Sequence, residues 1–288
     1  MTEEQNNLNN SEILFLYGAK KCNPNGDMDN ENKPRMDWDT GTNLVSDVRL
    51  KRYIRDYLEK VKGETLFVTN KAEDAKERVK QLGDDDILDL IGVRLFGAVQ
   101  ATEEADHLTG PVQFNWGYSL NKVELQETKT ITSSFSSGEG VGKDYRVKYS
   151  FIAFSGGING LTAKDTQLTE EDVKLLDEAI VKSIPLNRTR SKIGQTPRLY
   201  LRIEMKDNET VLNDMREYIS LDYNVREEDV RDIDDFELDI DELIEYLSDN
   251  RDKLGRLNYW KDNKLTIKNS NFSKLKEIFN SEYIELNY

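Results

Sequence analysis

The order of apolar and polar positions over the first 60 residues predicts a strand, a polar loop and a helix. Residues 12–19 form a short apolar run bounded by turn-forming residues, which is typical of a buried strand. A loop crowded with Asn, Asp, Gly and Pro follows, as far as about residue 43. Residues 44–61 repeat their apolar positions at helical spacing, so we expect an amphipathic helix there. Its core-facing stripe would consist of Leu50, Ile54, Tyr57, Leu58 and Val61.

The rest of the chain mixes helical and strand patterns without a fixed repeat. Helical patterns cover residues 73–91, 169–183, 239–249 and 272–280. Strand patterns cover residues 92–100, 110–120 and 198–205. Thr169 and Asp172 have the spacing of a capping box, which marks the start of a helix. Irregular mixing of this kind favours an α+β fold built on an antiparallel sheet.

Residues 121–150 read as a long hairpin. Two strand patterns flank a tip rich in Gly and Ser at residues 133–142. The second strand would bury alternate aromatic and β-branched residues, including Val147, Tyr149 and Phe151. It also carries Lys143, Arg146 and Lys148, so the hairpin would be a basic arm.

Composition points to the cytoplasm and away from a membrane. The chain has 288 residues and 37% hydrophobic residues, enough for a sizeable core, but no apolar run long enough to span a bilayer. The first residues are polar and acidic, unlike a signal peptide. Cys22 is the only cysteine, which excludes an internal disulfide and a cysteine-based zinc site.

The negative charge is concentrated in one segment. The chain nets −15, and residues 203–250 hold 18 acidic and 4 basic side chains, so the remainder nets only −1. The acidic segment cannot lie against a polyanion, and we expect it to be a solvated or partner-facing surface. The overall charge therefore does not exclude nucleic acid as a partner of the rest of the chain.

Residues 187–202 form a basic window without an acidic side chain. Its cations are Arg188, Arg190, Lys192, Arg198 and Arg202. Short polar side chains lie between them, at Asn187, Thr189, Ser191 and Gln195. Cations supply charge and short polar groups supply position when a protein holds a phosphate backbone. We therefore favour phosphate contact here over an ordinary surface loop.

The helix predicted over residues 44–61 carries four cations, Arg49, Lys51, Arg52 and Arg55. At about 100° per residue, Arg52 and Arg55 point away from the apolar stripe, and Arg49 and Lys51 flank them. The result would be a basic face opposite the core. An ordinary solvated face is an equally good interpretation of this pattern.

The polar loop of residues 22–35 raises the question of a metal site. Asp27, Asp29 and Glu31 resemble the start of a calcium-binding loop, but Asn32 and Trp38 stand where that loop needs Gly and Glu. A calcium loop is therefore excluded. Two carboxylates would still suffice for Mg²⁺ with substrate phosphates, so a hydrolytic site stays open.

Several short motifs, taken in order, carry a family resemblance. They are NPNGD at 23–27, DNEN at 29–32, KPR at 33–35, VSDVRLKRYIRDYL at 45–58, FGAV at 96–99, GPVQF at 110–114 and RSKIGQ at 190–195. Together they resemble the Cas-seven family, the backbone subunit of the CRISPR type I interference complex (Cascade), in its type I-B, Csh-two-like form. The resemblance runs from about residue 12 to about residue 206.

The resemblance implies an architecture and a set of partners. Residues 1–288 would form one palm-type domain with an RNA-recognition-motif-like (ferredoxin-like) sheet. Residues 62–109 would be a helical finger insertion, residues 121–150 a thumb hairpin, and residues 203–250 the acidic segment. The expected partners are CRISPR RNA, neighbouring copies of the chain, other Cascade subunits and target DNA within the R-loop.

The implied site binds RNA through its backbone, without catalysis, metal or cofactor. The candidate RNA-binding residues are Asn23, Asn25, Arg35, Arg49, Lys51, Arg52, Arg55, Lys143, Arg146, Lys148, Arg188, Arg190, Lys192 and Gln195. In this interpretation Asp27 and Asp29 orient nearby arginines or backbone N–H groups. The alternative is a metal-dependent RNA endonuclease that uses Asp27 and Asp29, as type III backbone subunits do. A third possibility is an interaction module that binds through the acidic segment.

Overall fold

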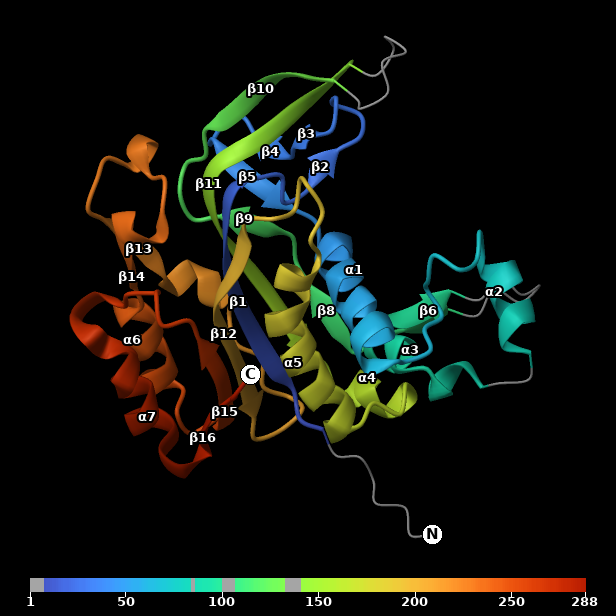
Figure 1. The fold of residues 1–288 in the computed structure, drawn as a ribbon. Helices are drawn as coiled ribbons and strands as arrows, with labels where there is room; N and C mark the ends of the chain where they lie inside the picture. Colours follow the sequence, from blue (N-terminus) through green and yellow to red (C-terminus); the bar gives the residue numbers. More distant parts are fainter. Residues whose placement is uncertain (1–7, 84–85, 100–106, 133–140) are drawn as a thin grey trace.

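The chain is built around a large, mostly antiparallel sheet (Figure 1). A computed structural model describes residues 8–83, 86–99, 107–132 and 141–288. Within these residues the sheet has the strand order β16-β15-β12-β1-β11-β9-β5-β4, and β8 and β10 also pair with β11. The long strands are β1 (Ser11–Cys22), β10 (Leu125–Thr132), β11 (Val141–Ile158), β12 (Gln195–Met205) and β15 (Leu254–Lys261). The short strands are β4 (Met36–Asp37), β5 (Thr42–Val45), β8 (Val112–Phe114), β9 (Gly117–Ser119) and β16 (Tyr283–Glu285).

Strand β1 lies at the centre of the sheet, between β11 and β12. Phe15 is opposite Phe154 of β11 on one side and Tyr200 of β12 on the other. Because side chains alternate along a strand, Phe15 joins the hydrophobic core on one face and Leu14 joins the core on the other. Both faces of the sheet must therefore be covered.

Two helices cover the first face, α1 (Asp47–Tyr57) and α5 (Glu170–Leu186), and they pack against each other (Figure 1). The capping box of α5 is confirmed: the Asp172 amide donates to Thr169 Oγ1 at 3.1 Å, and the Thr169 amide donates to Asp172 at 3.0 Å. The predicted stripe of α1 is wrong at Val61, which is 53% exposed. The helix widens into a π-helical turn at Leu58–Lys62, which changes the angular spacing and turns Val61 outward.

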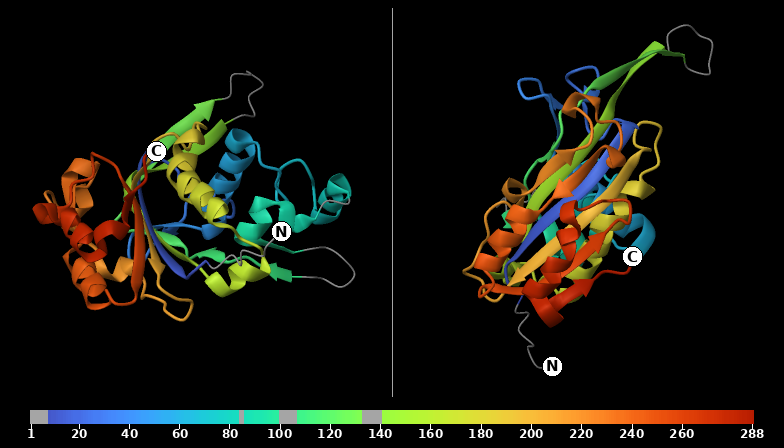
Figure 2. Two further views of the ribbon diagram at one scale, coloured as in Figure 1. Left: turned by 90° about the horizontal axis from the view of Figure 1, so that it is seen from below. Right: turned by 90° about the vertical axis from the view of Figure 1, so that its left-hand side faces the viewer.

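The acidic segment and the C-terminal residues cover the second face (Figure 2). Their elements are a 3-10 turn (Met215–Tyr218), β13 (Ser220–Tyr223), β14 (Phe236–Asp239), α6 (Asp241–Asp249) and α7 (Lys274–Phe279). Apolar side chains of the acidic segment, such as Met215, Phe236 and Leu243, pack with Leu14 and Leu16 of β1. The apolar side chains of the acidic segment therefore belong to the second hydrophobic core, and its acidic side chains lie on the outer side of that core.

The described residues between 62 and 109 build a small satellite around helices α2 (Ala75–Leu82) and α3 (Ile91–Phe96) and strands β6 (Gly97–Val99) and β7 (His107–Thr109). The strand predicted over residues 92–100 is wrong for its first part, which is helix α3. Arg94 stabilises that helix by pairing with Asp172 at 2.7 Å and by donating to the Asp89 carbonyl at 2.7 Å. Gly97, with φ +74°, then ends the helix and starts β6.

The predicted hairpin is confirmed in its strands, with Leu125 of β10 opposite Val147 of β11. Val147, Tyr149 and Phe151 are buried, as the alternation predicted. Of the predicted tip at residues 133–142, residues 133–140 lie outside the described residues, and Val141 and Gly142 belong to β11. The α+β class is confirmed as well. No helix among the described ranges is long and apolar enough to cross a bilayer.

A buried ion pair joins α5 to the sheet and gives a stability prediction. Asp177 accepts two hydrogen bonds of 2.8 Å from Arg202, and a third of 2.6 Å from Tyr200. The Asp177→Ala change leaves the buried Arg202 charge with only a 3.8 Å contact to Glu204, so we expect it to lower the free energy of unfolding by about 3–5 kcal/mol. Urea unfolding measures this loss.

The control for this prediction is on the same helix. Glu171 and Lys174 form an exposed pair at 2.6 Å, and the Glu171→Ala change should cost about 0–1 kcal/mol. Equal losses for Asp177→Ala and Glu171→Ala would contradict the assignment.

Candidate nucleic-acid interface

The polar loop of residues 22–35 and the basic loop of residues 187–194 are fastened together. Lys192 Nζ donates to the carbonyl oxygens of Asn23 at 2.6 Å and Pro24 at 3.1 Å. The Asn23 amide donates to the Ser191 carbonyl at 2.8 Å, and the Lys20 amide donates to the Gly194 carbonyl at 2.8 Å. Two candidate segments that lie far apart in sequence therefore form one surface.

The asparagines of the polar loop act as internal braces. Asn23 is 2% exposed, and its Nδ2 donates to the Asn32 carbonyl at 2.7 Å. Asn25 Oδ1 accepts hydrogen bonds from the Ser46 amide at 2.9 Å and the Ser46 hydroxyl at 3.0 Å, at the start of α1. A Cβ at Gly26 would lie 1.9 Å from Asn32 Oδ1, so a larger residue there would displace the Asn32 side chain. These groups fix the loop against α1.

Gln195 is a brace as well. It is buried, and its Nε2 donates to the Tyr53 hydroxyl at 3.2 Å and to the Lys192 carbonyl at 3.1 Å. Its amide therefore ties the basic loop to α1 at the start of β12.

A cavity of about 710 Å³ opens between α1 and the basic loop. Arg49, Arg52 and Tyr53 of α1 line it together with Asn187 and Arg188 of the loop. The Arg49 guanidinium lies 4.5 Å from the centre of the Tyr53 ring, and its buried Nε makes no hydrogen bond. Arg52 pairs with Asp56 at 2.9 Å. We call this cavity the α1 groove. Its lining includes four cations, Arg49, Arg52, Lys60 and Arg188, and one carboxylate, Asp56. An excess of cations on one surface suits a phosphate backbone.

The four-cation face predicted for α1 is wrong for two of its members. Lys51 is 8% exposed, and its Nζ lies 2.9 Å from Gln113 Oε1 and 3.3 Å from Asp47. The Arg55 guanidinium lies 5.0 Å from the centre of the Phe96 ring, and burial lowers the pKa of Arg55. The physical reason is that Phe96 and Gln113 pack on the flank of α1, so of these four cations only Arg49 and Arg52 line the groove.

The exposed part of the basic loop carries Arg188 and Arg190. Lys192 lies deeper, and burial, helped by the positive charge of Arg49, lowers its pKa to about 8. Burial also raises the pKa of the Cys22 thiol to about 12, so Cys22 is a neutral neighbour at pH 7. Lys192 is therefore a strut between the loops rather than an open phosphate contact.

The hairpin cations lie next to carboxylates. Lys143 is exposed and lies 3.8 Å from Glu31. Arg146 pairs with Asp144 at 2.6 Å and donates to the Lys21 carbonyl at 3.1 Å. Lys148 pairs with Glu124. The hairpin is therefore a less basic arm than its sequence predicts.

The two aspartates of the polar loop, Asp27 and Asp29, differ in their surroundings. Asp27 pairs with Arg35 at 3.2 Å, which confirms that it orients an arginine, and the Arg35 guanidinium lies 6.0 Å from the centre of the Trp116 ring. Asp29 is exposed. In the part of the chain that the structure describes, no three His, Cys, Asp or Glu side chains gather closely enough to hold a metal ion.

Tyr53 is one of the groove residues that the sequence interpretation missed, with Asp56 and Lys60 among the others. It is buried, stacks under Arg49 and accepts the Gln195 hydrogen bond. Arg49 and Tyr53 are four residues apart, a spacing that places them side by side on a helix, so this signal was present in the sequence.

The fold matches solved structures over almost its whole length. A chain of a complex described as "CRISPR RNA-guided surveillance complex, pre-nicking" aligns with a TM-score of 0.58 and 13% identity, covering 97% of this chain and 96% of that one. A chain of a second such complex, "CRISPR RNA-guided surveillance complex", aligns with a TM-score of 0.55 and 14% identity, covering 97% and 95%. These similarities show a shared fold.

Sequence comparison then gives the family. The family profile described as "CRISPR-associated protein Cas7" matches residues 9–241. A relative from Haloferax volcanii, described as "CRISPR-associated protein Cas7", is 33% identical over 304 residues, which cover 90% of this chain and 89% of the relative. The chain belongs to the Cas7 family.

The burial of Lys192 predicts a pH dependence of stability. Its pKa is about 8 in the folded protein and about 10.4 in an unfolded chain, so between these values the unfolded state binds more protons. The free energy of unfolding of the parent protein, measured relative to that of Lys192→Met, should therefore increase as the pH rises through this range. The expected increase is on the order of 1–3 kcal/mol. Below about pH 8 the difference should be constant. Urea unfolding of both proteins at several pH values measures it, and a difference that stays flat up to about pH 10.4 would contradict the buried strut.

Proposed function

We propose that this chain is a backbone subunit of a type I Cascade complex that binds CRISPR RNA by its phosphate backbone. The observation that carries the proposal is the α1 groove, where Arg49, Arg52 and Arg188 from two separate elements meet. Several copies would lie side by side along one RNA and present it for pairing with target DNA. Base pairing would then read the target sequence, and the protein would hold only the shape and charge of the RNA.

The strand order supports an RNA-recognition-motif-like palm. In β12-β1-β11-β9, with α1 and α5 on one face, the order equals that of a ferredoxin-like βαββαβ unit, 4-1-3-2. We assign residues 62–109 to the finger insertion and residues 121–150 to the thumb, because the described parts of both project from this sheet (Figure 1). The type I-B, Csh-two-like assignment rests on the sequence motifs alone.

The expected partners follow from this role. They are CRISPR RNA, neighbouring copies of the chain, other Cascade subunits and target DNA within the R-loop, all in the cytoplasm. The proposed RNA contacts are Arg49, Arg52, Arg188 and Arg190, with Lys143 on the hairpin. We assign Asn23, Asn25, Lys192 and Gln195 to positioning, because their polar groups brace the two loops.

We further propose that the subunit does not cut RNA. Asp27, one of the two candidate carboxylates, forms an ion pair with Arg35 at 3.2 Å. A carboxylate held by a guanidinium is a poor magnesium ligand, because the metal would have to displace the arginine.

The groove gives a prediction for RNA affinity. At about 0.1 M salt, loss of one phosphate contact to a single strand weakens binding roughly fivefold and lowers the log–log salt slope by about 0.7. We expect this effect for Arg52→Ala and for Arg188→Ala, and about twice the slope change in the double variant. Filter binding of guide RNA at several salt concentrations measures both quantities.

A matched control comes from the exposed turn after α6. Arg251→Ala with Lys253→Ala removes the same charge far from the groove along the sequence. If this control weakens RNA binding as much as the groove variant, the groove is not the site.

The absence of catalysis is tested on the assembled complex. Complementary RNA incubated with the complex and Mg²⁺ should stay intact, because Asp27 is engaged by Arg35. Regularly spaced cuts that disappear in Asp27→Asn or Asp29→Asn would instead establish the endonuclease alternative.

A further inference from the structure

A second hollow lies at the base of the hairpin, on the face of the sheet opposite the α1 groove. Its volume is about 410 Å³. It is lined by the end of β1, the base of the hairpin and the acidic segment, through Lys20, Lys21, Gln126, Lys148, Arg231, Asp232 and Asp235. Four of these side chains are cations, so the hollow would be a competing site for a polyanion if nothing neutralised it.

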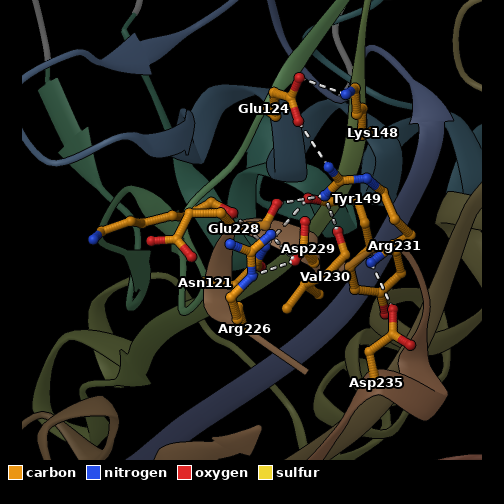
Figure 3. Close-up of polar contacts among 11 residues, drawn as sticks. Asn121, Glu124, Lys148, Tyr149, Arg226, Glu228, Asp229, Val230, Arg231 and Asp235 are labelled. Atoms are coloured by element: carbon orange, nitrogen blue, oxygen red, sulfur yellow. Dashed lines mark hydrogen bonds and ion pairs between the residues drawn. The ribbon is translucent and has the colours of Figure 1, made fainter. Parts of the chain in front are cut away.

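Carboxylates neutralise most of the cations around this hollow. Lys20 pairs with Asp232, and Lys148 pairs with Glu124. Glu124 also accepts a 2.7 Å contact from Arg231, so one carboxylate bridges the hairpin and the acidic segment (Figure 3). Just beside the hollow, Lys122 lies 3.4 Å from Glu227. Both Asp232 and Glu227 belong to residues 227–235.

Residues 227–235 hold six acidic side chains and one basic one. Their backbone is fixed, because Val230 and Ile233 are buried in the second core. Asp232 and Asp235 form a capping box at a short 3-10 turn. Burial opposes ionisation of Asp232, but the hydrogen bonds from Lys20 and the Ile233 amide outweigh it and lower the pKa of Asp232. The hydrogen bond from Lys148 lowers the pKa of Glu124. The carboxylates therefore stay charged and in place.

The two faces of the sheet thus differ in how many of their cations lie next to a carboxylate. On the α1 side, Arg52 pairs with Asp56, but Arg188 and Arg190 of the basic loop are exposed to solvent. On the opposite side, Lys20, Lys122 and Lys148 each meet a carboxylate. Their positive charge is cancelled within a few ångströms, well inside the screening length of about 8–10 Å.

We propose that residues 227–235 shield the cations at the base of the hairpin, so that nucleic acid is confined to the α1 groove on the opposite face. Glu227 and Asp232 are then specificity-determining residues, which act by repelling the wrong binding mode. This inference rests on the proposed function, since a shield has a purpose only if the other face binds RNA.

The test removes the two shielding charges and keeps their hydrogen bonds. In Glu227→Gln with Asp232→Asn, glutamine can still accept from the Lys122 amide and asparagine can still cap the 3-10 turn. The RNA-free full-length protein is titrated with oligo(dT), which carries no CRISPR repeat. Lys20 and Lys122 then lose their carboxylate partners and can contact phosphates. Oligo(dT) should bind between roughly fivefold and 25-fold more tightly at about 0.1 M salt, and the log–log salt slope should steepen by about 0.7–1.4.

The matched control is Glu242→Gln with Glu245→Gln, which removes the same charge from exposed positions on α6. We expect little change in oligo(dT) binding for this control. An equal gain in both double variants would overturn the proposal, because net charge alone would explain it. Should the double variant fail to fold, the single Glu227→Gln and Asp232→Asn proteins carry the test, each with about half the slope change.

Guide-RNA binding separates the two proposals. If the parent protein binds guide RNA but the shield variants gain no oligo(dT) affinity, the shield is wrong and the proposed function stands. If the parent protein does not bind guide RNA, the proposed function fails first, and the shield fails with it.

Discussion

The structure depends on one constraint: strand β1 is hydrogen-bonded on both edges and buried on both faces. A strand in this position needs apolar side chains in succession, and the run ILFLY supplies them. Each face then needs its own cover. Helices α1 and α5 cover one, and the apolar side chains of the acidic segment cover the other. The acidic segment therefore supplies part of the second hydrophobic core, whatever it contacts on its outer side.

The separation of charge follows from this two-sided cover. On one face, α1 and the basic loop place arginines at the α1 groove. On the other face, the acidic segment places carboxylates next to the cations at the base of the hairpin. At the end of β1 and the start of β12, Lys192 fastens the loop after β1 to the loop before β12. A small number of braces thus holds the cations of the groove at fixed positions. Preorganised cations lose less entropy when they bind a backbone, which favours RNA of one shape without reading its bases.

Sequence patterns predicted those parts of the fold that local signals determine. Strand β1 has a continuous apolar run, and α5 has a capping box and a clear stripe. The helix at Ile91–Phe96 was missed, because Arg94 stabilises it through Asp172, a residue far along the chain. The burial of Lys51 and Arg55 was missed for the same reason, since Gln113 and Phe96 come from another segment. Arg49, Arg52 and Arg188, all predicted as candidate RNA contacts, line the α1 groove. Which cations of α1 face the groove depends on tertiary contacts that periodicity does not contain.

Ultraviolet cross-linking of the assembled complex with its guide RNA, read by mass spectrometry, tests the central claim most directly. We expect cross-linked peptides from α1 and from residues 187–194, because these elements line the groove. We expect few from residues 227–249, which lie on the opposite face. A pattern dominated by the acidic segment, with α1 left unmodified, would contradict the assignment of the two faces.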